Sequence, residues 1–406
     1  MAVMEVRRAL PADHAFTPTP SPPVAHESAQ PAPHPLAALP QTSAAAPVVQ
    51  QAPAAQTQTA AQGVKPGGTT PGLSDAQEHQ RLTQGLETLK ENKTLLKPDQ
   101  KGPEVLLLQQ QLKHLGLHVK ETGVLDKSTE GYIKAIQTGG GLGADGVVGP
   151  KTVDAVLKLD TVPKPAATPG SDSAAGGTPA ADNVDHIPDD PKLAAIYLFN
   201  RKRAASAQEE LTPAQQKDMD QFIKNWDKNK ARYETASAAS GIPAKLIASL
   251  HWRESTGDFG TYLHQGDPLG KKAKHEPSDI PLFKEWEPAA EHALGLKSSI
   301  QRAYKIDANT TDEAALASYA ERYNGTGYFD YHAIASPYVY SGTDQYQKGK
   351  YRSDGGPGYD PNYKDPQLGV LPMLRGIDKH EKELAVKAAQ QAAAAAAQNP
   401  NQHFAQ

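Results

Sequence analysis

Apolar residues recur at helical spacing in two separate stretches of the chain. In the first, Val105, Leu108, Leu112 and Leu115 follow one another at intervals of three or four residues, and Gly116 comes next. This spacing places all four on one face of a helix, and a glycine just past the last apolar residue is typical of a helix end. Two further helical faces follow, made by Tyr132, Ile133, Ile136, Val153, Val156 and Leu157. The pattern predicts a small bundle of three helices within residues 76–160.

The second stretch, residues 191–380, has a longer series of helical patterns. Thr212, Pro213 and Gln215 form a capping box with proline at the first helical position. The long amphipathic helix that they begin ends at Gly241, and the next helix starts at Ile242. Two further helices are expected at residues 288–297 and 312–323, and beyond them the chain is rich in Tyr, Gly, Pro and Asp without a strong period. The sequence therefore predicts a mainly α protein that includes a long ordered-loop region.

One acidic residue continues an apolar stripe. Leu246, Leu250 and Glu254 are spaced four residues apart, so on a helix they share one face. If the two leucines face a core, the Glu254 carboxyl lies at the edge of that core. Partial burial disfavours the charged form of a carboxyl, which is the property that a general acid needs at neutral pH. The alternative is an ordinary glutamate exposed at a helix end.

Composition divides the rest of the chain. Residues 1–75 are rich in Pro, Ala, Gln and Thr and hold few aromatic residues, so we expect a disordered arm there. Residues 161–190, rich in Pro, Gly, Ala and Ser, are predicted to form a linker, and residues 381–406 an Ala/Gln-rich tail.

Charge and residue usage exclude several classes of protein. The net charge is −4 with both signs mixed, and the chain has no cysteine. We therefore expect no nucleic-acid partner and no Cys-based metal or nucleophile chemistry. The four histidines between positions 251 and 292 lack a recognisable metal-ligand spacing, so no metal or cofactor is predicted. No apolar run approaches the length of a membrane span.

The first stretch resembles the peptidoglycan-binding domain of the three-helix type. The resemblance rests on an ordered series of turn and core residues: Gly102, Val105, Leu108, Gln109, Leu112, Gly116, Gly123, Leu125, Asp126, Thr129, Gln137, Leu142, Asp145, Gly146, Val148, Gly149 and Thr152. Ile136 departs from the family, which usually has an aromatic residue there. The resemblance implies binding of cell-wall glycan or stem peptide. The alternative is a bundle that serves only as a spacer.

The second stretch is similar to the lysozyme superfamily, including goose-type lysozymes and soluble lytic transglycosylases. The segment Arg253-Glu254-Ser255-x-Gly257 resembles their Glu-Ser motif. Seventy residues after Glu254 (324 − 254), the segment Arg322-Tyr323-Asn324-Gly325 resembles their second motif at a helix end. The resemblance implies that residues 191–380 form a lysozyme-like domain with Glu254 as the general acid. The loop after Glu254 lacks the Gly-Leu-Met-Gln phrase common in both families.

Asp267 is the candidate for a second catalytic carboxylate. It follows Glu254 by thirteen residues (267 − 254), a spacing like that of goose-type lysozymes, and hydrolysis usually requires such a group to activate water. The resemblance thus favours a muramidase, which cleaves the β-1,4 bond between N-acetylmuramic acid and N-acetylglucosamine. Three alternatives stay open: Asp267 as a turn residue before Pro268, a lytic transglycosylase that needs only Glu254, and an inactive lysozyme-like fold that only binds the wall.

A tyrosine-rich segment near the second motif suggests sugar contacts. Tyrosine faces can stack on pyranose rings while the hydroxyl reaches a polar partner. Among its tyrosines we expect only Tyr323 and Tyr328 to line the cleft. Together with Asn324, Ser255 and His264, they form the predicted substrate-binding set.

The first sixteen residues lack the apolar segment of a Sec signal peptide. For action in the periplasm or cell wall, we therefore expect either release by lysis, as for a prophage endolysin, or export by a specialised secretion system. An exported effector would add two partners to peptidoglycan, the secretion machinery and an immunity protein. The sequence leaves both routes open.

Overall fold

A computed structural model describes residues 73–160, 185–275, 277–352 and 358–398. The described residues are mainly helical, which confirms the predicted fold class. Their one sheet is a two-stranded antiparallel pair, β1 (Lys350–Tyr351) and β2 (Tyr359–Asp360), in which Lys350 lies opposite Asp360. None of the helices in the described ranges has the length and apolar character that a bilayer crossing requires. The predicted N-terminal arm lies outside the described residues, except for its last few.

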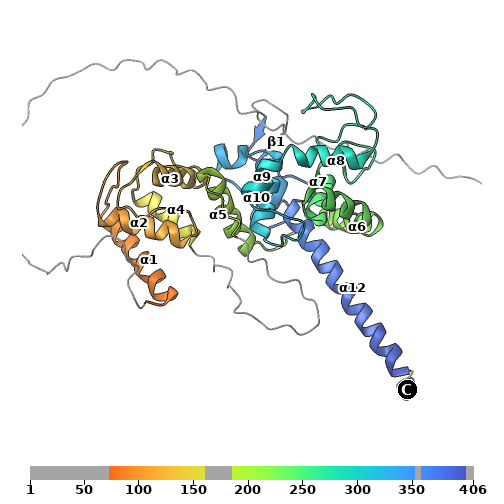
Figure 1. Ribbon diagram of the computed structural model, residues 1–406, viewed down its shortest axis with the longest axis horizontal. Coiled ribbons are helices and arrows are strands. Elements are labelled where there is room, and N and C mark those ends of the chain that lie inside the picture. Colours follow the sequence, from red (N-terminus) through yellow and green to blue (C-terminus); the bar gives the residue numbers. More distant parts are fainter. Residues whose placement is uncertain (1–72, 161–184, 276, 353–357, 399–406) are drawn as a thin grey trace, which may run out of the picture.

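The N-terminal bundle, residues 75–160, contains four helices (Figure 1). The three predicted helices are observed as α2 (Pro103–His114), α3 (Lys127–Gly139) and α4 (Pro150–Leu159). An additional helix that was not predicted, α1 (Asp75–Glu91), packs on α2 and α4 and buries Leu82, Leu86 and Leu89. Ser74 and Gln77 form a capping box at its start, so its beginning is encoded locally.

Two buried glutamines hold the turns of the bundle in the same way. The side-chain amide of Gln109 donates to the Val124 carbonyl at 2.9 Å and lies 3.1 Å from the Thr129 hydroxyl, while its oxygen accepts from the Gly123 N–H at 2.8 Å. Gln137 repeats the arrangement in the next turn, with the Val147 carbonyl, the Thr152 hydroxyl and the Gly146 N–H. Both glutamines are essentially inaccessible to solvent. The bundle therefore repeats one helix–turn–helix unit, since each glutamine satisfies backbone groups of the turn that follows it.

The N-terminal bundle packs directly against the C-terminal unit, residues 185–398. Helix α5 (Pro191–Ser206) contacts α3 on one side and α10 (Glu313–Asn324) on the other. Helix α3 can approach the C-terminal unit this closely because residue 139 is a glycine. A Cβ at that position would come within about 2.6 Å of the Phe199 and Phe329 rings. Most of the predicted linker lies outside the described residues, but His186 and Ile187 near its end are buried.

Helix α7 (Ala244–Ser255) lies in the interior of the C-terminal unit. It packs on α6 (Pro213–Ser240) and on α12 (Val370–Gln398), and every residue from 246 to 255 is buried. The other elements are α8 (Trp286–Gly295), α9 (Ser298–Ala303), the π-helix η1 (Tyr328–His332) and α11 (Pro337–Tyr340). The helix that carries Glu254 is therefore central to this unit.

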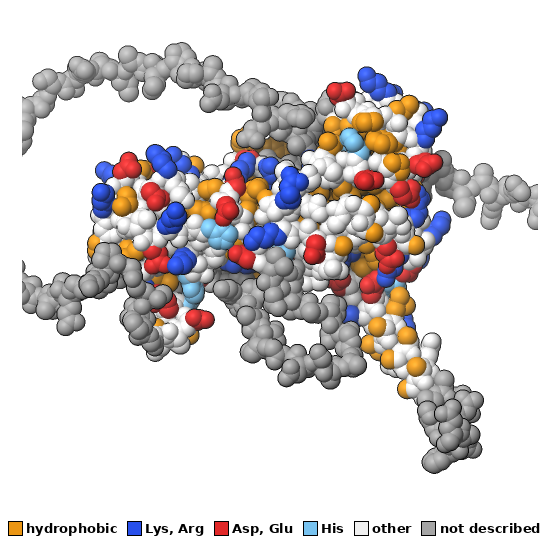
Figure 2. All heavy atoms as spheres, viewed as in Figure 1, with side chains coloured by type: hydrophobic (Ala, Val, Ile, Leu, Met, Phe, Trp, Pro, Cys, Tyr) orange, Lys and Arg blue, Asp and Glu red, His pale blue; other side chains and the backbone are white. Residues whose placement is uncertain are grey.

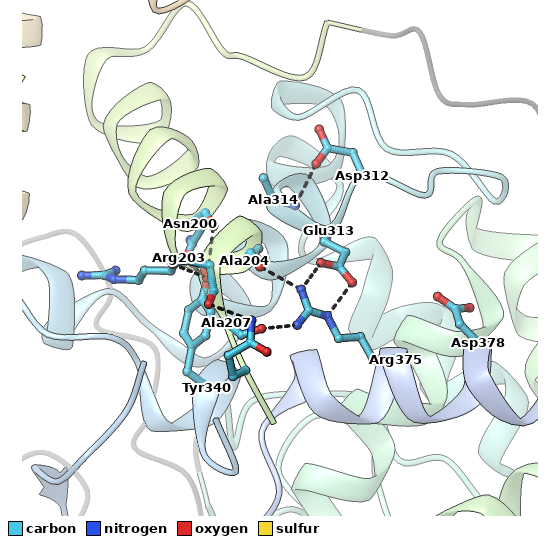
Figure 3. Close-up of polar contacts among 12 residues, drawn as sticks. Asn200, Arg203, Ala204, Ala207, Asp312, Glu313, Ala314, Tyr340, Arg375 and Asp378 are labelled. Carbon is cyan, nitrogen blue, oxygen red and sulfur yellow. Dashed lines mark hydrogen bonds and ion pairs between the residues drawn. The ribbon is translucent and has the colours of Figure 1, made fainter. Parts of the chain in front are cut away.

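Arg375 links three helices at one side of the C-terminal unit (Figure 3). Its guanidinium contacts both carboxylate oxygens of Glu313, at 2.8 and 2.6 Å. It also donates to the carbonyls of Ala207 and Ala204, at 2.9 and 2.8 Å. These carbonyls lie at the C-terminal end of α5, where backbone acceptors lack helical partners. One side chain of α12 thus fixes the end of α5 to the start of α10.

Beyond residue 381, α12 projects from the body of the molecule (Figure 1). The side chains described from residue 382 onward are exposed, so this half of the helix has no packing partner among the described residues. The predicted Ala/Gln-rich tail is helical as far as Gln398.

Candidate functional site

Glu254 lies in the last turn of α7, at the edge of the core. Leu246 and Leu250, on the same stripe, are completely buried, whereas Glu254 is 9% exposed. The chain leaves the helix through Thr256 and Gly257, both with positive φ. The structure therefore places this carboxyl where the spacing of the stripe predicts it.

A tyrosine hydroxyl is bonded to the Glu254 carboxylate. The hydroxyl of Tyr338, in α11, donates to Oε1 of Glu254 at 2.7 Å. Burial, followed by the charge of Glu254, raises the pKa of Tyr338 well above its usual range, so its proton is retained at any working pH. Tyr323 is affected in the same way, its pKa being raised first by burial and then by Glu254. Tyr338 was not among the predicted site residues, and its only signal in the sequence was its place in the tyrosine-rich segment.

Two cations lie over the rings of these tyrosines. The guanidinium of Arg253 is 4.8 Å from the centre of the Tyr338 ring and is paired with Asp365 at 3.0 Å. The ammonium of Lys297 is 5.5 Å from the centre of the Tyr323 ring. Burial and, after it, the charge of Arg322 lower the pKa of Lys297 to about 8, against an opposing effect of the Glu254 charge. The electrostatic surroundings of Glu254 thus include a cation that titrates near neutral pH.

The loop after α7 folds back over the end of that helix. Gly266 has φ +78°, and a Cβ at this position would lie 2.6 Å from the backbone carbonyl oxygen of Glu254. The Tyr323 hydroxyl donates to the carbonyl of Leu263 at 2.9 Å, which joins the loop to the end of α10. The two sequence motifs therefore meet through this loop.

Asp267 accepts hydrogen bonds that shape the loop. Its Oδ2 accepts from the backbone N–H groups of Lys274 and His275, at 2.7 and 2.9 Å, and its Oδ1 lies 2.8 Å from Nδ1 of His275. Burial acts to raise the pKa of Asp267, but the donors from His275 and Lys274 outweigh it and the pKa is lowered. Both oxygens are therefore engaged in holding residues 267–275 together, as expected of a structural turn residue.

The remaining residues of the predicted substrate-binding set are mostly buried, each with different neighbours. Asn324 is buried close to the site, and its side-chain oxygen has no hydrogen-bond partner among the described residues. The Ser255 hydroxyl is buried and contacts the His251 carbonyl at 3.4 Å. Burial lowers the pKa of His264 to about 3, and its Nε2 lies 2.9 Å from a ring nitrogen of His292. Tyr328 is almost fully buried and its oxygen accepts from the backbone N–H of Tyr351, so it supports β1.

A second candidate site is a cavity of about 380 Å³ between the N-terminal bundle and the C-terminal unit. It lies beside Gly139, and its lining includes four cationic side chains: Lys151, Lys158, Lys202 and Arg203. Burial lowers the pKa of Lys202, and the charges of Lys158 and Arg203 lower it further. Asp154 also lines the cavity, so the four cations face one acid there. The face in Figure 2 mixes acidic and basic side chains in the same way.

Comparison with known proteins identifies one part of the chain. Residues 101–156 match the family model for a peptidoglycan binding domain. The matched segment contains α2, α3 and most of α4, and it ends before α5. A search of curated proteins and a search of solved structures each found no match. The match supports a peptidoglycan-binding domain in the N-terminal bundle and an association of the protein with the cell wall.

Proposed function

We propose that this protein is a peptidoglycan hydrolase that cleaves the β-1,4 bond between N-acetylmuramic acid and N-acetylglucosamine. In this proposal the C-terminal unit is a lysozyme-like catalytic domain and Glu254 is its general acid. The observation that carries the proposal is the position of Glu254 at the edge of a core, bonded to Tyr338 and close to Tyr323. The peptidoglycan-binding domain beside it supplies the substrate class. The substrate places the proposed action in the periplasm or the cell wall.

The proposed chemistry starts with a proton transfer. Protonated Glu254 gives its proton to the glycosidic oxygen, the bond to the anomeric carbon breaks, and positive charge develops on the sugar ring. The resulting carboxylate keeps the hydrogen bond from Tyr338, which is stronger when its acceptor is charged. Water then adds to the anomeric carbon, and its proton must be taken by a base.

Asp267 is the residue that we propose as this base, but its surroundings favour a second candidate reaction. Three donors already occupy its oxygens, from the backbone of Lys274 and His275 and from the His275 ring. In a lytic transglycosylase the 6-hydroxyl of the sugar attacks instead of water and leaves a 1,6-anhydro end, so no second carboxylate is required. The engagement of Asp267 within its own loop favours this variant of the proposal.

The experiment that tests the proposal compares glycan cleavage by the wild type and Glu254→Gln. Amide replacement keeps the shape but removes the proton donor, so we expect activity to fall by about 10²- to 10⁴-fold. A zymogram with embedded peptidoglycan measures the loss, and mass spectrometry of the products separates reducing ends from 1,6-anhydro ends. Glu285→Gln, which changes an exposed glutamate at the start of α8, is the matched control and should retain activity.

Two outcomes would contradict the proposal. Equal clearing by the wild type and Glu254→Gln would remove Glu254 from the mechanism. If the wild type binds peptidoglycan but gives no clearing, the protein is a non-catalytic wall-binding protein.

A further inference from the structure

Three potential metal ligands converge at one corner of the N-terminal bundle. They come from three helices, with His79 on α1, His114 at the end of α2 and Asp160 as the C-cap of α4. One nitrogen from each histidine and one carboxylate oxygen of Asp160 all lie within 4.8 Å of one another. The ligands are far apart in sequence, so no spacing rule could have predicted the cluster.

The distances among these atoms fit a tetrahedral ion. His79 Nδ1 lies 3.2 Å from His114 Nε2 and 3.2 Å from Asp160 Oδ2, and His114 Nε2 lies 3.8 Å from Asp160 Oδ1. Zinc–nitrogen and zinc–oxygen bonds of about 2.0–2.2 Å at tetrahedral angles separate neighbouring ligand atoms by roughly 3.3 Å. We propose that a zinc ion binds here to three protein atoms: Nδ1 of His79, Nε2 of His114 and one carboxylate oxygen of Asp160.

The carboxylate is already oriented by a buried amide. The side-chain nitrogen of Gln111 donates to Asp160 Oδ2 at 2.6 Å, and Gln111 is fully buried on the inner face of α2. Outer hydrogen bonds of this kind fix the direction of metal ligands. The Asp160 side chain is 8% exposed, whereas the histidine side chains are 43% and 31% exposed. One side of the cluster is therefore rigid, and the other is open to a fourth ligand such as water.

The donor set selects the class of metal. Two imidazoles and one carboxylate suit zinc and related transition ions, whereas magnesium and calcium prefer sites made of oxygen ligands alone. Without a metal, a hydrogen bond between the two histidine nitrogens needs a proton on one of them. A bound ion replaces that proton, so the lone pairs of both histidine nitrogens bind the metal.

The position of the cluster indicates what the ion does. His79 and Asp160 lie outside the matched segment 101–156, while His114 lies within it. The ion thus ties the additional helix α1 and the end of α4 to the peptidoglycan-binding domain. Because the ligands come together only in the folded bundle, binding stabilises the folded state.

Isothermal titration of the full chain with zinc chloride, after removal of metals with EDTA, tests this inference. We expect one zinc site that magnesium does not fill. We expect at least tenfold weaker binding for His79→Ala and for His114→Ala, and a 10- to 100-fold loss for Gln111→Leu through its outer hydrogen bond. Cobalt substitution should give the visible absorption of a tetrahedral site, and zinc should raise the melting temperature.

His118→Ala is the matched control, because His118 belongs to the same bundle but pairs with Asp185 and Asp189 instead. It should bind zinc like the wild type. His79→Ala removes a ring that is 43% exposed and lies outside the core of the bundle, so this variant is expected to fold, and circular dichroism verifies that. Zinc affinity that is unchanged in both folded His79→Ala and His114→Ala would overturn the inference, as would the absence of zinc binding to the wild type. The inference is independent of the proposed cleavage reaction.

Discussion

At the scale of single residues, Glu254 is in contact with both apolar and polar groups. The leucines one and two turns earlier in α7 are buried, while Tyr338 supplies a hydroxyl at 2.7 Å. Burial disfavours a charged carboxylate, and a hydrogen-bond donor favours it. The proposed reaction requires Glu254 to hold a proton and then release it, so changes at these neighbours should alter activity.

Tyr338→Phe removes the donor and keeps the ring. A hydrogen bond to a charged group contributes about 1.5–3 kcal/mol, so we expect a loss of cleavage of roughly 10- to 100-fold. The alkaline limb of the pH–rate profile should move to higher pH, because the charged form of Glu254 loses a stabilising contact. Tyr340→Phe is the control, since the Tyr340 hydroxyl bonds to Asn200 and should leave the profile in place. An unshifted profile in Tyr338→Phe would show that this hydroxyl acts only in folding.

Gly266→Ala should disturb the site through the backbone. The added methyl group would meet the Glu254 carbonyl at 2.6 Å, and φ +78° is unfavourable for alanine by about 1–2 kcal/mol. Gly270→Ala carries similar strain at φ +74° but meets no atom within 4 Å. We therefore expect Gly266→Ala to lose more stability in urea and more cleavage than Gly270→Ala. Equal effects would mean that the loop does not press on α7.

At the scale of elements, a buried histidine joins α7 to its neighbours. The Trp286 indole N–H, from α8, donates to Nε2 of His251 at 3.1 Å, and Nδ1 lies 3.0 Å from the Tyr233 hydroxyl on α6. Burial lowers the pKa of His251 to about 4. The ring is therefore neutral when the protein is folded. Protonation would place a buried charge between three helices, and the Asp258 carbonyl, 3.1 Å from Nε2, offsets its cost only in part.

The low pKa of His251 predicts acid sensitivity with a definite sign. The unfolded histidine titrates near pH 6.5, so between pH 6.5 and about 4 the unfolded state binds more protons than the folded state. Stability is complete above this window and falls as the pH drops through it, by about 3 kcal/mol for a shift of this size. His264, with its pKa lowered to about 3, adds to the same trend.

Urea unfolding at a series of pH values measures the slope, which should be smaller in His251→Gln. His118→Gln is a control of opposite sign, because its bond to Asp189 raises the pKa of His118. Its contribution to stability is present at low pH and is lost as the pH rises. A His251→Gln slope equal to that of the wild type would contradict the assignment.

At the scale of the whole molecule, the peptidoglycan-binding domain and the C-terminal unit form one packed body. Their contact, through α3 and α5, brings Lys151 and Lys158 of one part beside Lys202 and Arg203 of the other. Four cations and one acid, Asp154, line the cavity, so an anion that enters it would meet more positive than negative charge. Stem peptides of peptidoglycan carry carboxylates, which fit such a site.

Lys202→Glu should therefore weaken binding to insoluble peptidoglycan. We expect severalfold less protein in the pelleted fraction, and a weaker dependence on salt than for the wild type, because one cation is replaced by an acid. Lys224→Glu makes the same change on the exposed face of α6, away from the cavity lining, and should pellet like the wild type. The cavity would lose its proposed role if both variants pelleted equally.

The sequence by itself determined the local features of this protein. Apolar spacing located α2, α3, α4 and α7, and the stripe through Leu250 placed Glu254 at a core edge. The sequence also encodes α1, which was not predicted: Ser74 and Gln77 form its capping box, and three leucines follow at helical spacing. These features depend on interactions within one or two helical turns, so a linear pattern contains them.

Only the tertiary structure decided which distant groups meet. Tyr338 reaches Glu254 across 84 positions of the chain, and His79, His114 and Asp160 converge from three helices. The structure also showed Asp267 engaged with Lys274 and His275, which its spacing from Glu254 could not indicate. Periodicity records which face of an element is buried but not what packs against it. Long-range partners depend on how helices pack, and that is fixed by the sum of many weak contacts.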